Sequence, residues 1–277
     1  MTLSACRRYI EEQIYPIAGD CARVEAEQIL ISALNVSRTF LFAYPEKEIT
    51  AEQQRTIEEI SARRARGEPL QYIFGVAPFM GLEFTVRPGV LIPRRDTEVL
   101  VENALPYCRK KRVLDLCTGT GCIGISVARL GDPSQLALSD LSSDALVIAR
   151  ENAARNGVDP VFYQGDFLNA IPNGIQFDVI LSNPPYISTE EMEQLPLDVK
   201  EYEPTLALEA GADGLDAYRS ILEGVSRVLV SGGYLFFEIG YAQGEAVRAL
   251  MKMHSFQDVR VIQDYGGQDR VVFGCLI

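Results

Sequence analysis

Four consecutive residues, Asn183-Pro184-Pro185-Tyr186, follow a predicted buried strand and could hold a planar nitrogen group for reaction. Proline has no backbone N–H and fixes its own φ, so the two prolines cannot extend a sheet and must turn the chain stiffly. The Asn183 side-chain oxygen and the Pro184 carbonyl could then accept the two N–H bonds of an amide or aromatic amine, which directs its lone pair. Tyr186 could stack on the same flat group. By itself, a Pro-Pro pair is more often an ordinary turn.

A glycine-rich segment upstream, VLDLCTGTGCIG (113–124), reads as a strand, a turn and the start of a helix. In an open parallel sheet, ligands bind beyond the carboxyl ends of the strands, where glycines admit close approach and a helix N-terminus supplies N–H groups. Asp140 ends the next predicted strand, and a carboxylate there can accept hydrogen bonds from both ribose hydroxyls of an adenosine. The pattern predicts a site for a nucleoside cofactor.

The identity of that cofactor is less direct, because residues 119–124 (GTGCIG) also fit a dinucleotide fingerprint. A dehydrogenase therefore remains an alternative. Asp115 argues against it, since a carboxylate inside the strand end would repel a pyrophosphate but could help hold the ammonium group of a methionine moiety. Asp166 and Phe167 end the third predicted strand and could contact an adenine, although a turn explains them equally well. These features favour S-adenosylmethionine.

The elements that would position these residues alternate between strands and helices from about residue 93 onward, which predicts a parallel sheet covered on both faces. Two later apolar runs are separated by DYGGQD and should form a hairpin at the sheet edge. The expected strands are 112–116, 135–140, 161–164, 177–183, 233–239, 259–263 and 270–275, and the expected helices are 94–107, 122–130, 142–156 and 214–230.

Residues 1–70 read as a small helical domain. We expect Asp20 to cap one helix, and Thr50 with Gln53 to form a capping box for another that ends near Gly67. Residues 71–92 look like short strands separated by Gly and Pro residues that form turns, as in a hairpin linking two domains. The catalytic domain is then 93–277.

The composition of the chain excludes some classes of binding partner. The net charge of −12 disfavours tight binding to a phosphate backbone, so no direct nucleic-acid partner is expected. No apolar run approaches a membrane span and no signal core opens the chain, so we expect a cytoplasmic monomer that does not bind membranes. The six cysteines form no CxxC pair, and the single histidine is His254, so neither a metal site nor a histidine base is indicated.

Several segments together resemble the HemK/PrmC family, which methylates the side-chain amide of the glutamine in the Gly-Gly-Gln loop of peptide-chain release factors. They are GEPLQYIFG (67–75), VLIPRRDTEVLVE (90–102), the 113–124 segment, ILSNPPYI (180–187) and EYEPTLALEAGADGLDAYR (201–219). The resemblance implies a class I S-adenosylmethionine-dependent methyltransferase fold: a Rossmann-like α/β domain with a mostly parallel seven-stranded sheet, an N-terminal helical bundle and a β-hairpin linker.

The resemblance also assigns site residues. It implies N5-glutamine methylation that yields S-adenosylhomocysteine. From the separate composition of the helical domain, we expect that domain to be the docking surface for the release factor. Residues 183–186 would hold the glutamine, and the cofactor contacts, together with those argued above, would be Asp115, Cys117, Thr118, Gly119, Thr120, Gly121, Asp140, Asp166, Phe167 and Asn183. Three positions depart from the family: Cys117 replaces a usual glycine, Arg95 a usual second proline and Thr205 a frequent arginine.

Two alternative functions remain, and one further motif in the chain needs an explanation. An adenine N6 methyltransferase acting on nucleic acid would use the same acceptor pair, but the acidic charge and the lack of a basic recognition domain count against it. A non-catalytic cofactor-sensing adaptor would use the helical domain as its partner surface. Gly266-Gly267-Gln268 repeats the substrate tripeptide within the chain itself, and we expect a tight hairpin turn there rather than a modification site.

Overall fold

The computed structural model describes residues 1–277, which divide into two compact units. The first contains Met1–Gly75 together with Pro196–Tyr202, and the second contains Val76–Leu195 together with Glu203–Ile277. No helix in the chain is both long and apolar enough to cross a membrane.

The first unit is built from helices that bury one apolar stripe each. They are α1 (Leu3–Ala18), α2 (Ala22–Leu34), α3 (Arg38–Ala43), α4 (Ala51–Ala65) and α5 (Leu70–Phe74). In α1 the buried residues Leu3, Cys6, Ile10 and Ile14 recur every three or four positions and therefore face one side. They pack with residues of α2 and α4, including Ile29 and Ile57, into a core separate from that of the second unit.

The structure confirms one predicted helix cap and shows that the other is wrong. Thr50 accepts a hydrogen bond from the Gln53 backbone at 3.2 Å and the Gln53 side chain accepts one from the Thr50 N–H at 2.9 Å, which is a capping box. Asp20 instead lies inside a 3₁₀ turn that runs directly into α2. Because Cys21 before α2 is already in the helical region, the chain has no extended cap position there for Asp20 to serve.

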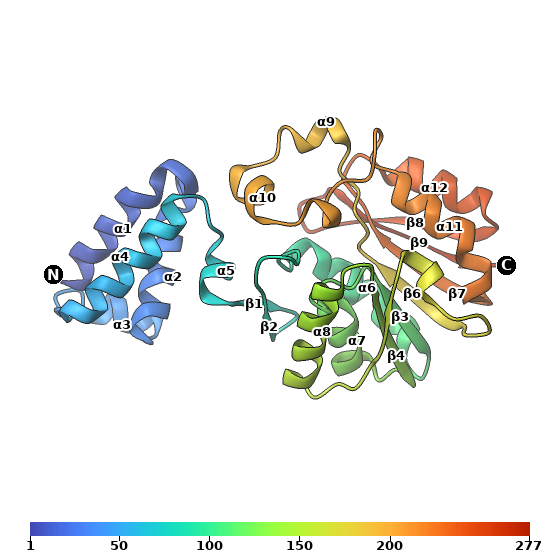
Figure 1. Ribbon diagram of the computed structural model, residues 1–277, viewed down its shortest axis with the longest axis horizontal. Helices are drawn as coiled ribbons and strands as arrows, with labels where there is room; N and C mark the ends of the chain where they lie inside the picture. The colour runs from blue at the N-terminus through green and yellow to red at the C-terminus, as the bar shows by residue number, and fades with distance from the viewer. The chain divides into compact units, whose positions relative to one another are not determined.

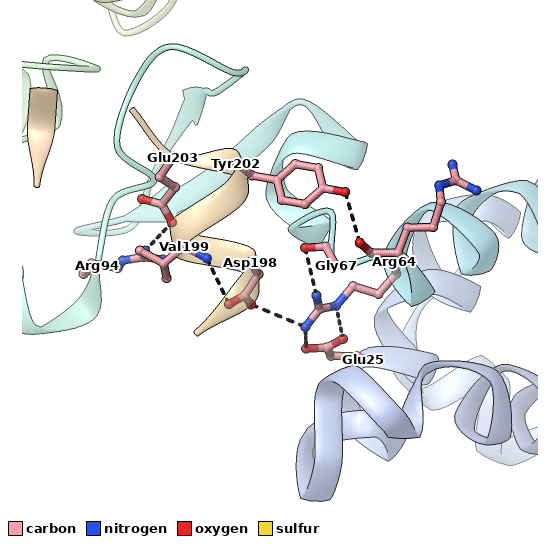
Figure 2. A network of polar contacts seen from close by, with 9 residues as sticks. Glu25, Arg64, Gly67, Arg94, Asp198, Val199, Tyr202 and Glu203 are labelled. Carbon is pink, nitrogen blue, oxygen red and sulfur yellow. Dashed lines mark hydrogen bonds and ion pairs between the residues drawn. The ribbon is translucent and has the colours of Figure 1, made fainter. Parts of the chain in front are cut away.

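A distant segment, α10 (Leu197–Tyr202), belongs to the helical unit (Figure 2). The Arg64 guanidinium, with its side chain only 5% exposed, donates to Glu25 at 2.7 and 3.1 Å and lies 3.6 Å from Asp198 of α10. The Tyr202 hydroxyl donates to the Arg66 carbonyl at 3.1 Å. Gly67 lies beside the Leu197 side chain of α10, and its φ of +98° favours glycine.

Arg64 should therefore contribute much more stability than its neighbour on the same helix. Arg64→Ala is expected to lower the free energy of unfolding by about 3 kcal/mol, because it leaves Glu25 and Asp198 without their buried counter-charge. Arg63 is the matched control, since its side chain is 34% exposed and pairs with Glu68 alone. Arg63→Ala should cost about 1 kcal/mol or less in urea unfolding followed by circular dichroism. Equal losses in the two variants would contradict this expectation.

The second unit confirms the predicted seven-stranded, mostly parallel sheet (Figure 1). Its strand order is β5-β4-β3-β6-β7-β9-β8, and only the β7–β9 and β9–β8 pairs are antiparallel. The strands are β3 (Arg112–Leu116), β4 (Gln135–Asp140), β5 (Val161–Gln164), β6 (Phe177–Ser182), β7 (Leu229–Glu238), β8 (Phe256–Gln263) and β9 (Asp269–Leu276). A separate antiparallel pair, β1 (Val76–Phe79) and β2 (Leu82–Thr85), precedes the sheet.

Both faces of the sheet are buried because successive strand residues point to opposite sides. Val113 and Phe236 pack with one set of helices, whereas their neighbours Leu114 and Phe237 pack with the other. The first set is α6 (Glu98–Cys108), α7 (Cys122–Gly131) and α8 (Ser143–Arg155), and the second is α11 (Asp216–Val228) and α12 (Gly244–Met253) (Figure 1).

Strand β7 differs from the prediction, which began it at residue 233. It begins at Leu229, and the pairing with β6 shifts register between Leu229 and Tyr234. Gly232, with a φ of +80°, and Gly233 lie within that irregularity, so they form part of the strand. The two glycines interrupt the regular pairing without ending the strand.

Candidate functional site

The predicted site residues come together where the sheet reverses its strand order. Chain order runs outward from β3 to β4 on one side and continues with β6 on the other, so loops leaving β3 and β6 diverge at this point. Leu116 is paired with Ser182, and the Ser182 hydroxyl donates to the Leu116 carbonyl at 2.8 Å. The next residues are Cys117 and Asn183, so the glycine-rich loop and the Asn-Pro-Pro-Tyr turn start side by side.

A cavity of about 420 Å³ lies at this edge. The sequence-predicted residues that line it are Cys117, Thr118, Gly119, Thr120, Asp140, Asp166, Phe167, Asn183 and Pro185. Asp115, Gly121, Pro184 and Tyr186 are not part of its lining, although Asp115 lies in β3 and the other three in the loops that follow β3 and β6. The structure thus gathers residues from the ends of four strands around one space.

The glycine-rich loop requires backbone conformations that favour glycine. Gly119 and Gly121 have φ values of +53° and +83°, in the left-handed region. Cys117 is there as well, with a φ of +60°, which accounts for the glycine usual at this position in the resembling family. Gly124 lies in the first turn of the helix after the loop, where a Cβ would collide with the Leu138 side chain.

Asp115 supports this loop from behind. Its carboxylate is fully buried and accepts hydrogen bonds from the Thr118 hydroxyl at 2.6 Å and from the Gly124 N–H at 2.9 Å. Burial raises the pKa of Asp115 to about 7. Its contact with a methionine ammonium group stays a prediction, while its contacts within the chain order the loop.

Asp140 is fixed at the cavity edge by two backbone donors. One carboxylate oxygen accepts from the Gly119 N–H at 2.8 Å and the other from the Ser142 N–H at 2.9 Å. Each oxygen can accept a further hydrogen bond, so the carboxylate is oriented and keeps capacity for two hydroxyl donors. A ribose diol presents two hydroxyl donors, and a carboxylate with two free acceptor positions matches them.

The Asn-Pro-Pro-Tyr turn is held by its downstream main chain. Ile187 donates to the Leu208 carbonyl and accepts from the Ala210 N–H, both at 2.8 Å. Asn183 and Pro185 face the cavity, and Tyr186 packs at the edge of the apolar core on the α11 side of the sheet. Burial raises the pKa of the Tyr186 hydroxyl, so this tyrosine remains neutral.

Two further walls of the cavity were not assigned a role from sequence. Segments 89–94 and 204–211 line it, as does the first turn of α11. Glu203, 5% exposed, joins the two segments because it accepts a hydrogen bond from the Arg94 guanidinium (Figure 2). It also accepts one from the Ile92 N–H. Both walls overlap segments 90–102 and 201–219, which carry the family resemblance. The resemblance pointed to these segments but did not show that they line the cavity.

A buried carboxylate, Glu238, lies at the end of β7 near Tyr186 and was also missed. It is 2% exposed, hydrogen-bonds Thr97 of the cavity wall, and keeps one oxygen without a partner. Burial raises its pKa to about 7, and the Arg270 and Arg94 charges only partly oppose that shift.

Glu238 should make stability depend on pH. Because its pKa is raised from 4.5 to about 7 on folding, the native state binds an extra proton between these values. Its contribution is present below pH 4.5 and is lost as pH rises through 7, with a slope of up to about 1.4 kcal/mol per pH unit. Glu238→Gln is expected to flatten this decline and to exceed the wild-type melting temperature at pH 8.

Thermal unfolding between pH 5 and pH 8 measures this effect. Asp115 has the same direction of shift, so a residual slope should remain in the variant. Glu245→Gln is the control, because the Glu245 side chain is 82% exposed on the following helix. Superimposable pH profiles for Glu238→Gln and the wild type would contradict the prediction.

The duplicate Gly-Gly-Gln tripeptide forms the tight hairpin turn that was predicted. Strands β8 and β9 pair on either side of it, and Asp264 donates through its N–H to the Gln268 carbonyl at 2.8 Å. The Asp264 carboxylate accepts from the Gly266 and Gln268 N–H groups at 2.9 and 3.0 Å.

The mostly parallel sheet, its antiparallel final strand and the position of the cavity define a class I methyltransferase fold. Two solved structures share that fold: a methyltransferase from Pyrococcus furiosus (TM-score 0.54, 15% identity, 70% of this chain and 89% of that one) and the T. thermophilus 16S rRNA N2 G1207 methyltransferase in complex with AdoMet and guanosine (TM-score 0.53, 18% identity, 73% and 50%).

Sequence comparison specifies the family. The Methyltransferase small domain matches residues 84–197, and the PrmC N-terminal domain matches residues 10–75. Release factor glutamine methyltransferases from Geobacter sulfurreducens (42% identity, 91% of this chain and 89% of that one) and Vibrio cholerae (37%, 99% and 96%) align over nearly the whole length. The chain belongs to the release factor glutamine methyltransferase family, as the sequence motifs indicated.

Proposed function

We propose that this protein methylates the side-chain amide nitrogen, N5, of the glutamine in the Gly-Gly-Gln motif of peptide-chain release factors, with S-adenosylmethionine as donor and S-adenosylhomocysteine as product. The observation that carries the proposal is the cavity shared by the glycine-rich loop after β3 and the Asn-Pro-Pro-Tyr turn after β6. Membership of the family supports the substrate assignment.

The residues around the cavity fit the cofactor. Asp140, oriented by two backbone N–H groups, would hold the ribose hydroxyls, and Asp166 with Phe167 would hold the adenine. The loop 117–121 would surround the methionine portion, with Asp115 ordering it from behind. S-adenosylmethionine supplies an electrophilic methyl group.

The acceptor corner would bind the substrate carboxamide. Asn183 lies at the cavity wall, and two prolines fix the main chain that presents the Pro184 carbonyl. An amide nitrogen is a poor nucleophile because its lone pair is delocalised, and two acceptors on its N–H groups direct that lone pair and stabilise positive charge that develops on nitrogen. Tyr186 covers the corner and helps to exclude water. A side chain that lacks both of these N–H groups would leave both acceptors unpaired and be rejected.

The direct test is incubation with radiolabelled S-adenosylmethionine and a purified release factor. We expect label in the release factor and none in its variant with alanine in place of the motif glutamine. Incubation with an oligonucleotide in place of the release factor tests the adenine N6 alternative, and we expect no label in the oligonucleotide. Calorimetry with NAD tests the dehydrogenase alternative, and we expect no binding heat. Label in the alanine variant, or none in the unmodified factor, would overturn the proposal.

The helical unit would dock the body of the release factor. Phe42 and Tyr44 are 51% and 56% exposed there, and the Arg7 and Arg38 guanidinium groups lie 6.0 and 5.8 Å from the Phe42 ring centre. Exposed aromatic residues beside arginines are typical of protein-binding surfaces. Both arginines also pair with the buried Glu27 carboxylate, at 3.8 and 2.9 Å, which holds their guanidinium groups beside the Phe42 ring.

Phe42→Ala should separate docking from chemistry. We expect KM for the whole release factor to rise about 5- to 30-fold, because an aromatic anchor is lost, while KM for a short Gly-Gly-Gln peptide stays unchanged. Met253→Ala, which truncates another exposed apolar side chain at 78% exposure, is the control. A parallel rise of KM for peptide and protein would refute the docking role.

A further inference from the structure

Gln243, in the turn between β7 and α12, joins three segments around the acceptor corner. Its Nε2 donates to the Tyr186 carbonyl at 2.9 Å and to the Gly214 carbonyl at 3.2 Å. Its Oε1 accepts from the Gly240 N–H at 3.0 Å. One carboxamide therefore connects the Asn-Pro-Pro-Tyr turn, the loop before α11 and the end of β7.

The surroundings are shaped for this carboxamide. A Cβ on Gly240 would lie 3.0 Å from Oε1 of Gln243, and one on Gly214 would lie 2.8 Å from Nε2 and would strike the Tyr186 carbonyl. Gly214 also has a φ of +71°, which favours glycine. Both neighbours thus leave space that the Gln243 side chain fills.

We propose that Gln243 is a positioning residue that fixes the acceptor corner for methyl transfer, an inference that rests on the proposed function. The Pro185 ring fixes φ, one of the few rotations between the Pro184 and Tyr186 carbonyls, so a hold on the Tyr186 carbonyl limits how far the Pro184 carbonyl can turn. Gln243 holds the Tyr186 carbonyl, and the Ile187 main chain is held by Leu208 and Ala210. The turn is thereby anchored downstream of the acceptors by both a side chain and the cavity wall.

Only a carboxamide satisfies this position. The Tyr186 and Gly214 carbonyls need two N–H donors, and the Gly240 N–H needs an acceptor. Glutamate has the same shape but, when ionised, has no donor and faces two carbonyl oxygens. When protonated it donates one O–H, so a glutamate variant should recover partly as pH falls. The titratable groups around this position are the Tyr218 hydroxyl, 3.5 Å from Oε1, and the nearby Tyr186 and Glu238. Burial raises the pKa of both tyrosines, so they stay neutral, and Glu238 titrates in wild type and variant alike, so the kcat ratio removes its shared effect.

The test compares Gln243→Glu with the wild type. We expect kcat for release-factor methylation to fall about 10- to 100-fold, as hydrogen bonds to the turn are lost, while the Kd for S-adenosylmethionine stays within about twofold. The ratio of variant kcat to wild-type kcat should rise as pH is lowered from 8 to 6. Gln263→Glu, the same change at an exposed position of β8, is the matched control and should behave as wild type.

A second measurement needs no substrate. The Ile187 and Thr189 amides donate to the Leu208 and Gly211 carbonyls at 2.8 and 2.9 Å, so their hydrogen exchange reports on the turn. Exchange in a peptide spanning 183–190 should accelerate in Gln243→Glu, while exchange over 113–140 should not. Should Gln243→Glu fail to fold, Gln243→Asn keeps the amide but shortens its reach, and the same acceleration is expected.

The outcomes separate the two proposals. A wild-type protein that does not methylate the release factor defeats the proposed function, and the exchange data still decide whether Gln243 anchors the turn. Unchanged exchange at 183–190, or wild-type kcat in the folded variant, overturns the positioning role. A kcat ratio that does not change with pH also overturns it, because a general packing defect would not be relieved by protonation.

Discussion

Asn183→Ala should reduce kcat for glutamine methylation by about 10²- to 10³-fold while the protein remains folded. The side chain lies in the cavity wall at the end of β6, beside the first residue of the glycine-rich loop. Removing it takes away one of two acceptors that orient the substrate nitrogen, and losses of this size are typical when one preorganised polar group is removed from a transition-state site.

The measurement is single-turnover transfer from labelled S-adenosylmethionine, with far-ultraviolet circular dichroism to confirm folding. Asn173→Ala, at an exposed turn position before β6, provides the control. A non-catalytic adaptor would retain release-factor binding in both variants and show no transfer in the wild type. Transfer by Asn183→Ala within a few-fold of wild type would defeat the mechanism.

Asp140→Asn should weaken S-adenosylmethionine binding by about 10- to 100-fold, since hydrogen bonds to a charged acceptor contribute about 1.5–3 kcal/mol. Both carboxylate oxygens already accept backbone N–H groups, from Gly119 and Ser142. An amide in that position must turn its NH₂ toward one of these donors, so it loses an acceptor and disturbs the loop. The effect should therefore exceed that of a simple loss of charge.

Isothermal titration calorimetry measures the affinity directly. Asp144→Asn is the control, because Asp144 is exposed in the first turn of α8 and carries the same charge. Wild-type affinity in Asp140→Asn, with the protein folded, would mean that the ribose is held elsewhere.

Local patterns predicted most of the second unit. The bounds of β3, β4 and β5 agree with the predicted strands, because each is a short apolar run closed by a turn or a charged residue. β7 begins at Leu229 rather than at residue 233, because the helix predicted over 214–230 ends at Val228 and the sheet accommodates Gly232 and Gly233 as an irregularity within the strand. The Asp20 cap was wrong because an N-cap depends on the conformation of the preceding turn, which composition alone does not specify.

The candidate site also has a part that the sequence predicted and a part that it did not. Its central residues were predicted because they follow strands directly, and parallel strands bring their carboxyl ends to one edge. Other parts of the site were not predicted, because their contacts in space are with residues far away in the sequence. They are the cavity walls at 89–94 and 204–211 and the buried Glu238. Their roles depend on contacts that no short-range pattern encodes.

By itself the sequence determined the fold class and the two loops that line the candidate site, and from them it predicted the chemistry. Periodicity, proline and glycine act over a few residues, and these features follow from them. Only the tertiary structure decided that α10 belongs to the helical unit through Arg64, that Asp115 lies behind its loop, and that Gln243 joins three segments. Each of these depends on hydrogen bonds and ion pairs between residues far apart in the chain, and folding alone brings such partners within bonding distance.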